Sequence, residues 1–73
     1  MIDKIRLIVA NKQEVPLQAI TPSMKFSTMD IDSLDFVELM QMIEAEFWRI
    51  PDERWASIDS CSDVARELEA CRP

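Results

Sequence analysis

The sequence has no glycine, histidine or tyrosine, and only two of its 73 residues are cysteine. Without glycine the chain cannot form a glycine-rich phosphate-binding loop, and without histidine we expect no zinc site. Cys61 and Cys71 fall on one predicted helix, roughly 15 Å apart along its axis, which is beyond the reach of a disulfide. We therefore expect reduced thiols and a cytoplasmic protein.

Basic residues are also few: 8 Lys and Arg stand against 14 Asp and Glu, giving a net charge of −6. Nucleic acids and anionic membranes need cationic surface, so we expect neither as a partner. Residues 30–53 hold eight of the acids and one base. This concentrated charge favours docking of basic proteins, although an acidic helix face can equally serve solubility alone.

No apolar run approaches the length of a membrane span, and the N-terminus lacks the pattern of a signal peptide. We expect no stable membrane insertion. A chain of 73 residues makes one small domain, which we place over residues 1–73.

Apolar residues at helical spacing predict a first helix over 2–13 and a second over 33–48. Residues 15–31 form a connection longer than usual. Pro51 followed by acids predicts a short third helix, and Ser60 begins a fourth as its cap. The pattern predicts an all-α four-helix bundle with a long first loop and a short third helix.

Ser33 lies between Asp32 and Asp35 at the expected start of the second helix. Two interpretations of this serine remain open. Its hydroxyl can cap the helix, as can that of many serines in this position, or it can be an exposed point of covalent attachment.

Metal binding and catalysis are both disfavoured by the residues around Ser33. A calcium loop counted from Asp30 has Leu34, Asp35 and Gln41 at its fifth, sixth and twelfth positions, where the motif requires a ligand, glycine and glutamate. A nucleophilic serine needs a base, usually histidine, and the chain has none. We expect no metal site and no enzymatic activity.

The run from Asp32 to Leu39 resembles the Asp-Ser-Leu-Asp-x-Val-Glu-Leu motif of the acyl carrier proteins and their peptidyl and aryl relatives. The likeness continues through Glu44–Phe47, Ile50–Glu53 and residues 58–68. It implies a 4′-phosphopantetheine arm, taken from coenzyme A and attached to Ser33.

The resemblance also implies roles for neighbouring residues. Asp32 and Leu34 would lie beside the arm. Partner enzymes would recognise a surface of the second helix formed by Asp35, Glu38, Gln41 and Glu44. The partners would be a phosphopantetheinyl transferase, an acyl-activating ligase and acyl-processing enzymes with basic docking patches, acting on a monomer. An acyl chain would shelter among core-facing residues, namely Met40, Ile43, Phe47, Val64 and Leu68.

Five residues depart from the family pattern, one of them Gln41, which replaces an apolar residue common on the partner-facing side. Asp30 stands where glycine is usual, and aspartate tolerates unusual backbone angles better than most residues. Phe36 is bulkier than its usual counterpart, and Trp48 and Trp55 are unexpected. These departures suggest a specialised, stand-alone carrier.

The expected function is therefore to hold acyl groups as thioesters for enzymes of fatty-acid, lipid or polyketide-type biosynthesis. An aminoacyl or peptidyl carrier is the nearest alternative, although the acidity of the second helix favours acyl cargo. An unmodified acidic adaptor for basic proteins is an alternative from another class.

Overall fold

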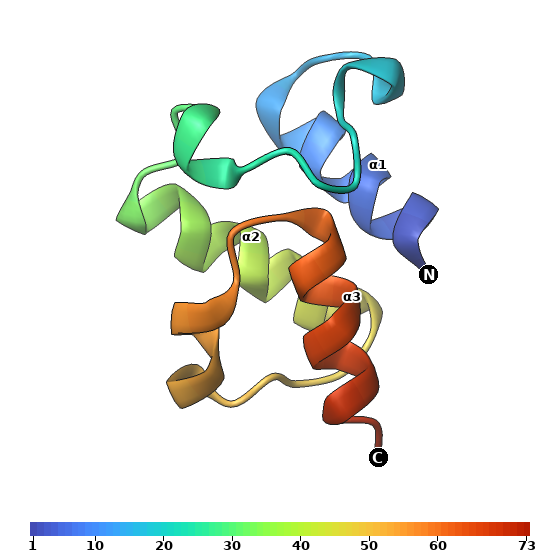
Figure 1. The fold of residues 1–73 in the computed structure, drawn as a ribbon, viewed down its shortest axis with the longest axis vertical. Helices are drawn as coiled ribbons and strands as arrows, with labels where there is room; N and C mark the ends of the chain where they lie inside the picture. Colours follow the sequence, from blue (N-terminus) through green and yellow to red (C-terminus); the bar gives the residue numbers. More distant parts are fainter.

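The computed structural model describes all residues from 1 to 73 and contains helices but no strands. Three α-helices form its frame: α1 (Ile2–Gln13), α2 (Ser33–Glu46) and α3 (Cys61–Ala70). The 3₁₀ helix η3 (Asp52–Ser57) lies between α2 and α3 in the chain, and α1 packs against both α2 and α3 (Figure 1). The expected all-α four-helix arrangement is thus confirmed, with a 3₁₀ helix as its short third member.

Helix α1 forms where the apolar spacing predicted it. Ile5 and Val9 are fully buried, and Ile2 and Ile8 pack at the edge of the core. The helix ends because Glu14 adopts a left-handed conformation, with φ 56°, and its N–H bonds back to carbonyls of the last turn. A non-glycine residue in this region is uncommon and carries some strain.

The connection from α1 to α2 contains two short 3₁₀ helices, η1 (Leu17–Ala19) and η2 (Phe26–Thr28). Ile20 and Phe26 anchor it in the core with 2% of each residue exposed. Arg6 on α1 adds a polar anchor, since its Nε donates to the Ile20 carbonyl at 2.7 Å. Leu17 and Met24, the other large apolar residues of the connection, belong neither to the core cluster nor to the side chains packed against it, whereas Met29 does pack against it.

Helix α2 begins at Ser33 as expected but ends at Glu46 rather than Trp48. At its end the backbone of Phe47 turns to φ −115° and ψ −99°. The carboxylate of Glu44 then accepts a hydrogen bond from the Ile50 N–H at 3.0 Å. Contacts made beyond the helix therefore determine its last residue.

A single cluster of buried apolar side chains joins the helices and the loops. It includes residues of every α-helix and of the connections: Ile5, Val9, Ala10, Ile20, Phe26, Leu39, Met40, Ile43, Ile50, Ile58, Cys61, Val64 and Leu68. Burial raises the pKa of the Cys61 thiol to about 11, which leaves it protonated and unreactive near neutral pH. Cys61 and Cys71 are both free thiols.

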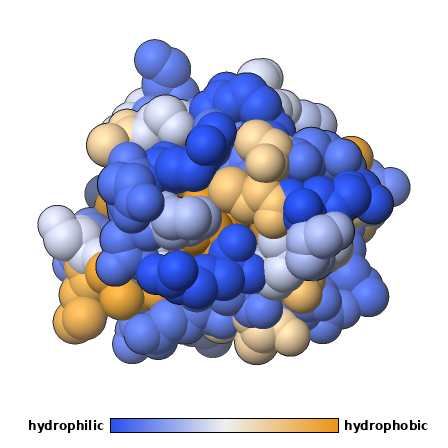
Figure 2. Space-filling model, turned by 90° about the horizontal axis from the view of Figure 1, so that it is seen from below, coloured by the Kyte–Doolittle hydropathy of each residue, from blue (hydrophilic) through white to orange (hydrophobic).

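The surface seen from below in Figure 2 is largely hydrophilic, with hydrophobic residues visible only in separate areas. None of the helices combines the length and apolarity that crossing a bilayer requires. The most exposed large apolar side chain is Leu34, with 69% of the residue accessible. It lies directly after Ser33.

Candidate functional site

Ser33 is the first residue of α2, and its side chain is exposed. The residue that caps the helix is Asp32, whose Oδ1 accepts a hydrogen bond from the Asp35 N–H at 2.8 Å. The interpretation of Ser33 as the helix cap is therefore wrong. Its hydroxyl makes no hydrogen bond within the chain, which leaves it available for a reaction.

The N-terminus of α2 favours an anion at this position. The first N–H groups of a helix have no partners along the helix, and the peptide dipoles add partial positive charge there. A phosphate ester on Ser33 would lie beside these groups. The residues present thus fit a phosphate-linked group attached to the serine oxygen.

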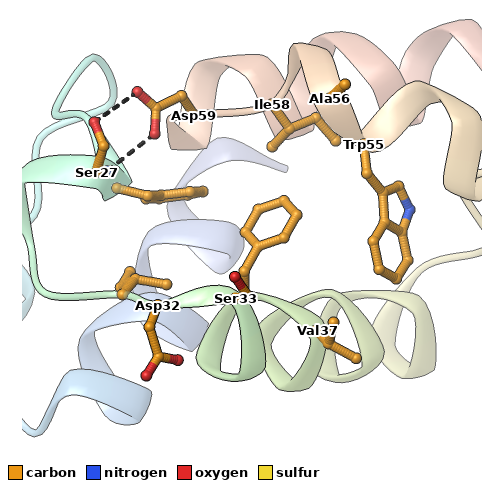
Figure 3. Close-up of a pocket in the computed structure, with 11 residues that line it drawn as sticks. Ser27, Asp32, Ser33, Val37, Trp55, Ala56, Ile58 and Asp59 are labelled. Carbon is orange, nitrogen blue, oxygen red and sulfur yellow. Dashed lines mark hydrogen bonds between the residues drawn. The ribbon is translucent and has the colours of Figure 1, made fainter.

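An open, mostly apolar groove of about 440 Å³ adjoins Ser33 (Figure 3). One wall comes from the start of α2, and the other from η3 and the residues before α3. The lining residues are Phe26, Ser27, Ile31, Asp32, Ser33, Phe36, Val37, Trp55, Ala56, Ile58 and Asp59.

Hydrogen bonds between Ser27 and Asp59 hold one end of the groove together. The backbone N–H and the hydroxyl of Ser27 each donate to the Asp59 carboxylate at 3.0 Å (Figure 3). The Phe26 N–H donates to the Asp59 carbonyl at 2.8 Å. The Asp59 N–H in turn donates to the carboxylate of Asp63 at 2.8 Å, so the α1–α2 connection is tied to the start of α3.

The η3 wall is held against α3 by the carboxylate of Glu67, which is 5% exposed. Arg54 Nε donates to it at 2.6 Å and Ser57 Oγ at 3.3 Å. Arg66 of α3 donates to the same carboxylate at 3.3 Å. The hydrogen bond from Arg54, more than any other contact, holds the pKa of Glu67 below its usual value.

The five residues expected to shelter an acyl chain face the core, as expected, and their contact with an acyl chain stays a prediction. Met40, Ile43, Val64 and Leu68 are all fully buried in the core, and Phe47 packs at its edge. None of the five lines the groove beside Ser33. The sequence signal for the groove was the unusual bulk of Phe36 and Trp55.

The four residues expected to face partners lie along α2 in different surroundings. Asp35 and Glu38 flank Lys12 of α1, whose Nζ lies 3.7 Å and 3.0 Å from their carboxylates. Gln41 is exposed and lines a second, shallow depression with Glu38. Glu44 is half-buried, and its carboxylate accepts a hydrogen bond from the Ile50 N–H. The structure therefore brings Asp35 and Glu38 together, whereas Glu44 stabilises the chain after α2.

The hydrogen bond with Glu38, ahead of other effects, raises the pKa of Lys12. The lysine therefore stays charged and offsets part of the α2 acidity near Ser33. No group of three or more potential ligands is placed to hold a metal ion.

Comparison with known proteins adds an independent result. The family described as "Phosphopantetheine attachment site" matches residues 3–68. The chain is 35% identical over 66 residues to the acyl carrier protein of Thermosynechococcus vestitus, covering 88% of this chain and 82% of that protein. It is 32% identical over 71 residues to the acyl carrier protein of Helicobacter pylori, covering 94% and 91%.

A third relative, the acyl carrier protein AcpXL of Mesorhizobium japonicum, is 38% identical over 55 residues, which is 73% of this chain. The chain spans only 59% of the length of that relative. The family match extends through Ser33 and both walls of the groove. The chain therefore belongs to the acyl carrier protein family.

Proposed function

We propose that this protein carries acyl groups on a 4′-phosphopantetheine arm attached to Ser33 and presents them to partner enzymes of fatty-acid, lipid or polyketide-type biosynthesis. The observation that carries the proposal is the exposed, unpartnered hydroxyl of Ser33 at the start of α2. Because Asp32 supplies the helix cap, esterification of Ser33 removes no contact that holds the fold. When attached, the arm supplies the thiol that bears the acyl group.

Attachment is a phosphoryl transfer from coenzyme A. Ser33 Oγ forms a new bond to the phosphorus that bears the pantetheine, and the bond from that phosphorus to the bridging pyrophosphate oxygen breaks. Adenosine 3′,5′-bisphosphate leaves, and the hydroxyl proton passes to a base on the transferase. This chain has no histidine to act as the base, so we assign it no catalytic role.

Asp32 and Leu34 flank the attachment point. We assign Asp32, whose carboxylate lies at the helix end, a contact with a cation on the transferase. Leu34 offers an exposed apolar contact next to the arm. Asp35, Glu38 and Gln41 form the α2 surface that we assign to basic docking patches, with Glu44 at its far end.

We place the protein in the cytoplasm as a monomeric, single-domain carrier. Its two free thiols suit a reducing compartment. Tethered cargo reaches a docked enzyme at high effective concentration. The protein therefore needs to supply a docking surface and a flexible tether, but no catalytic groups.

The test is intact mass after incubation with coenzyme A, magnesium and a broad-specificity phosphopantetheinyl transferase. The matched control for Ser33→Ala is Ser62→Ala, which removes an exposed serine from the first turn of α3. We expect one phosphopantetheine on the wild type and on Ser62→Ala, and none on Ser33→Ala.

Absence of any addition has two explanations, which the variant Asp30→Gly separates. If Asp30 blocks recognition by the transferase, the glycine restores modification. If Asp30→Gly also stays unmodified, the carrier proposal is wrong and an adaptor for basic proteins becomes the better assignment.

A further inference from the structure

We infer that the aromatic pair Phe36–Trp55 makes the groove beside Ser33 selective for a compact acyl group, a short chain or a single ring, and keeps longer chains out of the interior. This inference rests on the proposed function, because it concerns the cargo of the same arm. It assigns a specificity-determining role to two residues whose rings meet where the α2 and η3 walls of the groove join.

The two rings join the walls of the groove. Their centroids lie 5.9 Å apart at an interplanar angle of 85°, an edge-to-face contact between α2 and η3. Phe26 lies on the other side, with its ring 6.4 Å from that of Phe36. A cargo beside Ser33 therefore meets the Phe36 and Trp55 rings, which Phe26 supports from within the core. Aromatic rings offer a large apolar contact area on a rigid frame, which suits a compact apolar group.

The pair is held in place at both ends. The Trp55 indole N–H donates to the carbonyl of Ile50 at 2.9 Å, and Ile50 is fully buried. Phe36 belongs to the first turn of α2, where its N–H donates to the Asp32 carbonyl at 2.9 Å. The Arg54–Glu67 bond at 2.6 Å fixes η3 against α3. Separating the rings would therefore disturb several contacts at once.

No hollow continues inward behind the pair. Leu39, Met40, Ile43 and Val64 have no accessible surface. The only other depression lies on the α1–α2 side, against Lys12 and Glu38, and shares no residue with the groove. Because protein interiors are close-packed, a long chain could enter only by displacing core side chains.

The experiment loads Ser33 with a series of acyl groups and measures how each changes the protein. A promiscuous transferase attaches acetyl-, butyryl-, hexanoyl-, benzoyl- and palmitoyl-phosphopantetheine from the matching coenzyme A esters, and intact mass confirms each product. Thermal unfolding then gives a profile of melting temperature against cargo. For the wild type we expect the melting temperature to rise up to hexanoyl and benzoyl, with palmitoyl no higher.

Trp55→Leu opens the η3 wall, and its matched control is Trp48→Leu. Trp48 is also half-buried, and its indole N–H donates to a backbone carbonyl, that of Leu68, at 2.8 Å. It does not line the groove. We expect that in Trp55→Leu the highest melting temperature shifts toward the palmitoyl-loaded protein. In Trp48→Leu the profile of melting temperature against cargo should be unchanged. If Trp55→Leu fails to fold by circular dichroism, Phe36→Leu opens the opposite wall.

Fluorescence supplies a second readout. In Trp48→Phe the sole tryptophan is Trp55, and we expect its emission to shift on loading with hexanoyl or benzoyl. In Trp55→Phe the sole tryptophan is Trp48, whose emission should not respond to any cargo.

Three results would overturn the inference: palmitoyl stabilising the wild type more than hexanoyl, an unresponsive Trp55, or equal shifts of the profile in both leucine variants. Each of these is observed on protein already shown by mass to carry the arm. Failure of the proposed function appears earlier, as absence of any mass addition at Ser33, so the two failures are distinguishable.

Discussion

Asp32 accepts the hydrogen bond from the N–H of Asp35 at 2.8 Å and so relieves the neighbouring serine of any capping role. Adjacent residues at the start of α2 therefore have separate tasks. Asp32 secures the helix, while the hydroxyl of Ser33 makes no hydrogen bond within the chain. Stability and modification should respond to different substitutions.

We predict that Asp32→Ala lowers the free energy of unfolding by about 1 kcal/mol through loss of the cap. Ser33→Ala should change it by less than about 0.5 kcal/mol, as expected for a surface residue without contacts. Urea unfolding followed by circular dichroism measures both. Asp32→Asn is the control, since asparagine caps as well as aspartate but lacks the charge. Equal losses for Asp32→Ala and Ser33→Ala would contradict this division.

Asp30 occupies the family's usual glycine position in a left-handed conformation, with φ 57°. We predict that Asp30→Val costs about 1–2 kcal/mol, because a β-branched residue clashes with the backbone there. Asp30→Gly should be tolerated, since glycine adopts positive φ freely. Urea unfolding of the two variants measures the difference. Ala19→Val, at an exposed position of η1, is the comparison, and an equal loss there would assign the effect to something other than φ.

The sequence predicted α1 closely because its apolar stripe and its flanking residues act within a few turns. It likewise predicted the start of α3, where Ser60 accepts from the Asp63 N–H at 3.1 Å. The carboxylate of Asp63 reaches back to the N–H of Asp59 rather than to that of Ser60, so the cap differs in detail from a reciprocal capping box.

The groove could not be predicted, because its walls come from segments far apart in the chain. Phe26, Phe36 and Trp55 meet only after the α1–α2 connection and η3 fold against α2. Their bulk was visible in the sequence, but the pairing was not. The burial of Glu67 under Arg54 is equally non-local, and periodicity alone gave no sign that this acid faces inward.

Lys12 of α1 neutralises part of the acidic surface of α2. Its Nζ is 3.0 Å from Glu38 and 3.7 Å from Asp35. We predict that Lys12→Ser raises kcat/KM of the transferase several-fold at low salt, since removing the cation strengthens the field that steers basic partners. Glu38→Gln should lower it.

Salt provides the control for the Lys12 prediction. Added salt screens exposed charges, so the difference between Lys12→Ser and wild type should shrink as ionic strength rises. Lys4→Ser is the matched variant, because Lys4 also pairs with an α2 acid, Glu46, at 2.6 Å, but at the end of α2 remote from Ser33. An equal gain from Lys4→Ser would show that net charge, not the surface near Ser33, governs docking.

The Glu67 carboxylate makes the η3 wall sensitive to acid. Its hydrogen bond with Arg54, followed by the opposing effect of burial, leaves the pKa of Glu67 lower in the folded protein than its ordinary value of 4.5. A group with a depressed pKa stabilises the fold fully above its unfolded value, and that contribution is lost as pH falls through the folded value. We therefore predict that melting temperature declines below about pH 4.5.

Glu67→Gln should lower the melting temperature at pH 7 and flatten the decline in acid, because the glutamine does not titrate. Glu69→Gln, which affects an exposed pair with Arg72 at 2.7 Å, should leave the decline unchanged.

The fluorescence emission of Trp55, measured in the variant Trp48→Phe, reports directly on the η3 wall. If Glu67 holds η3 in place, this emission should change before the helical signal is lost as pH falls. Simultaneous loss of both signals would place the acid sensitivity in the whole fold rather than in the Arg54–Glu67 contact.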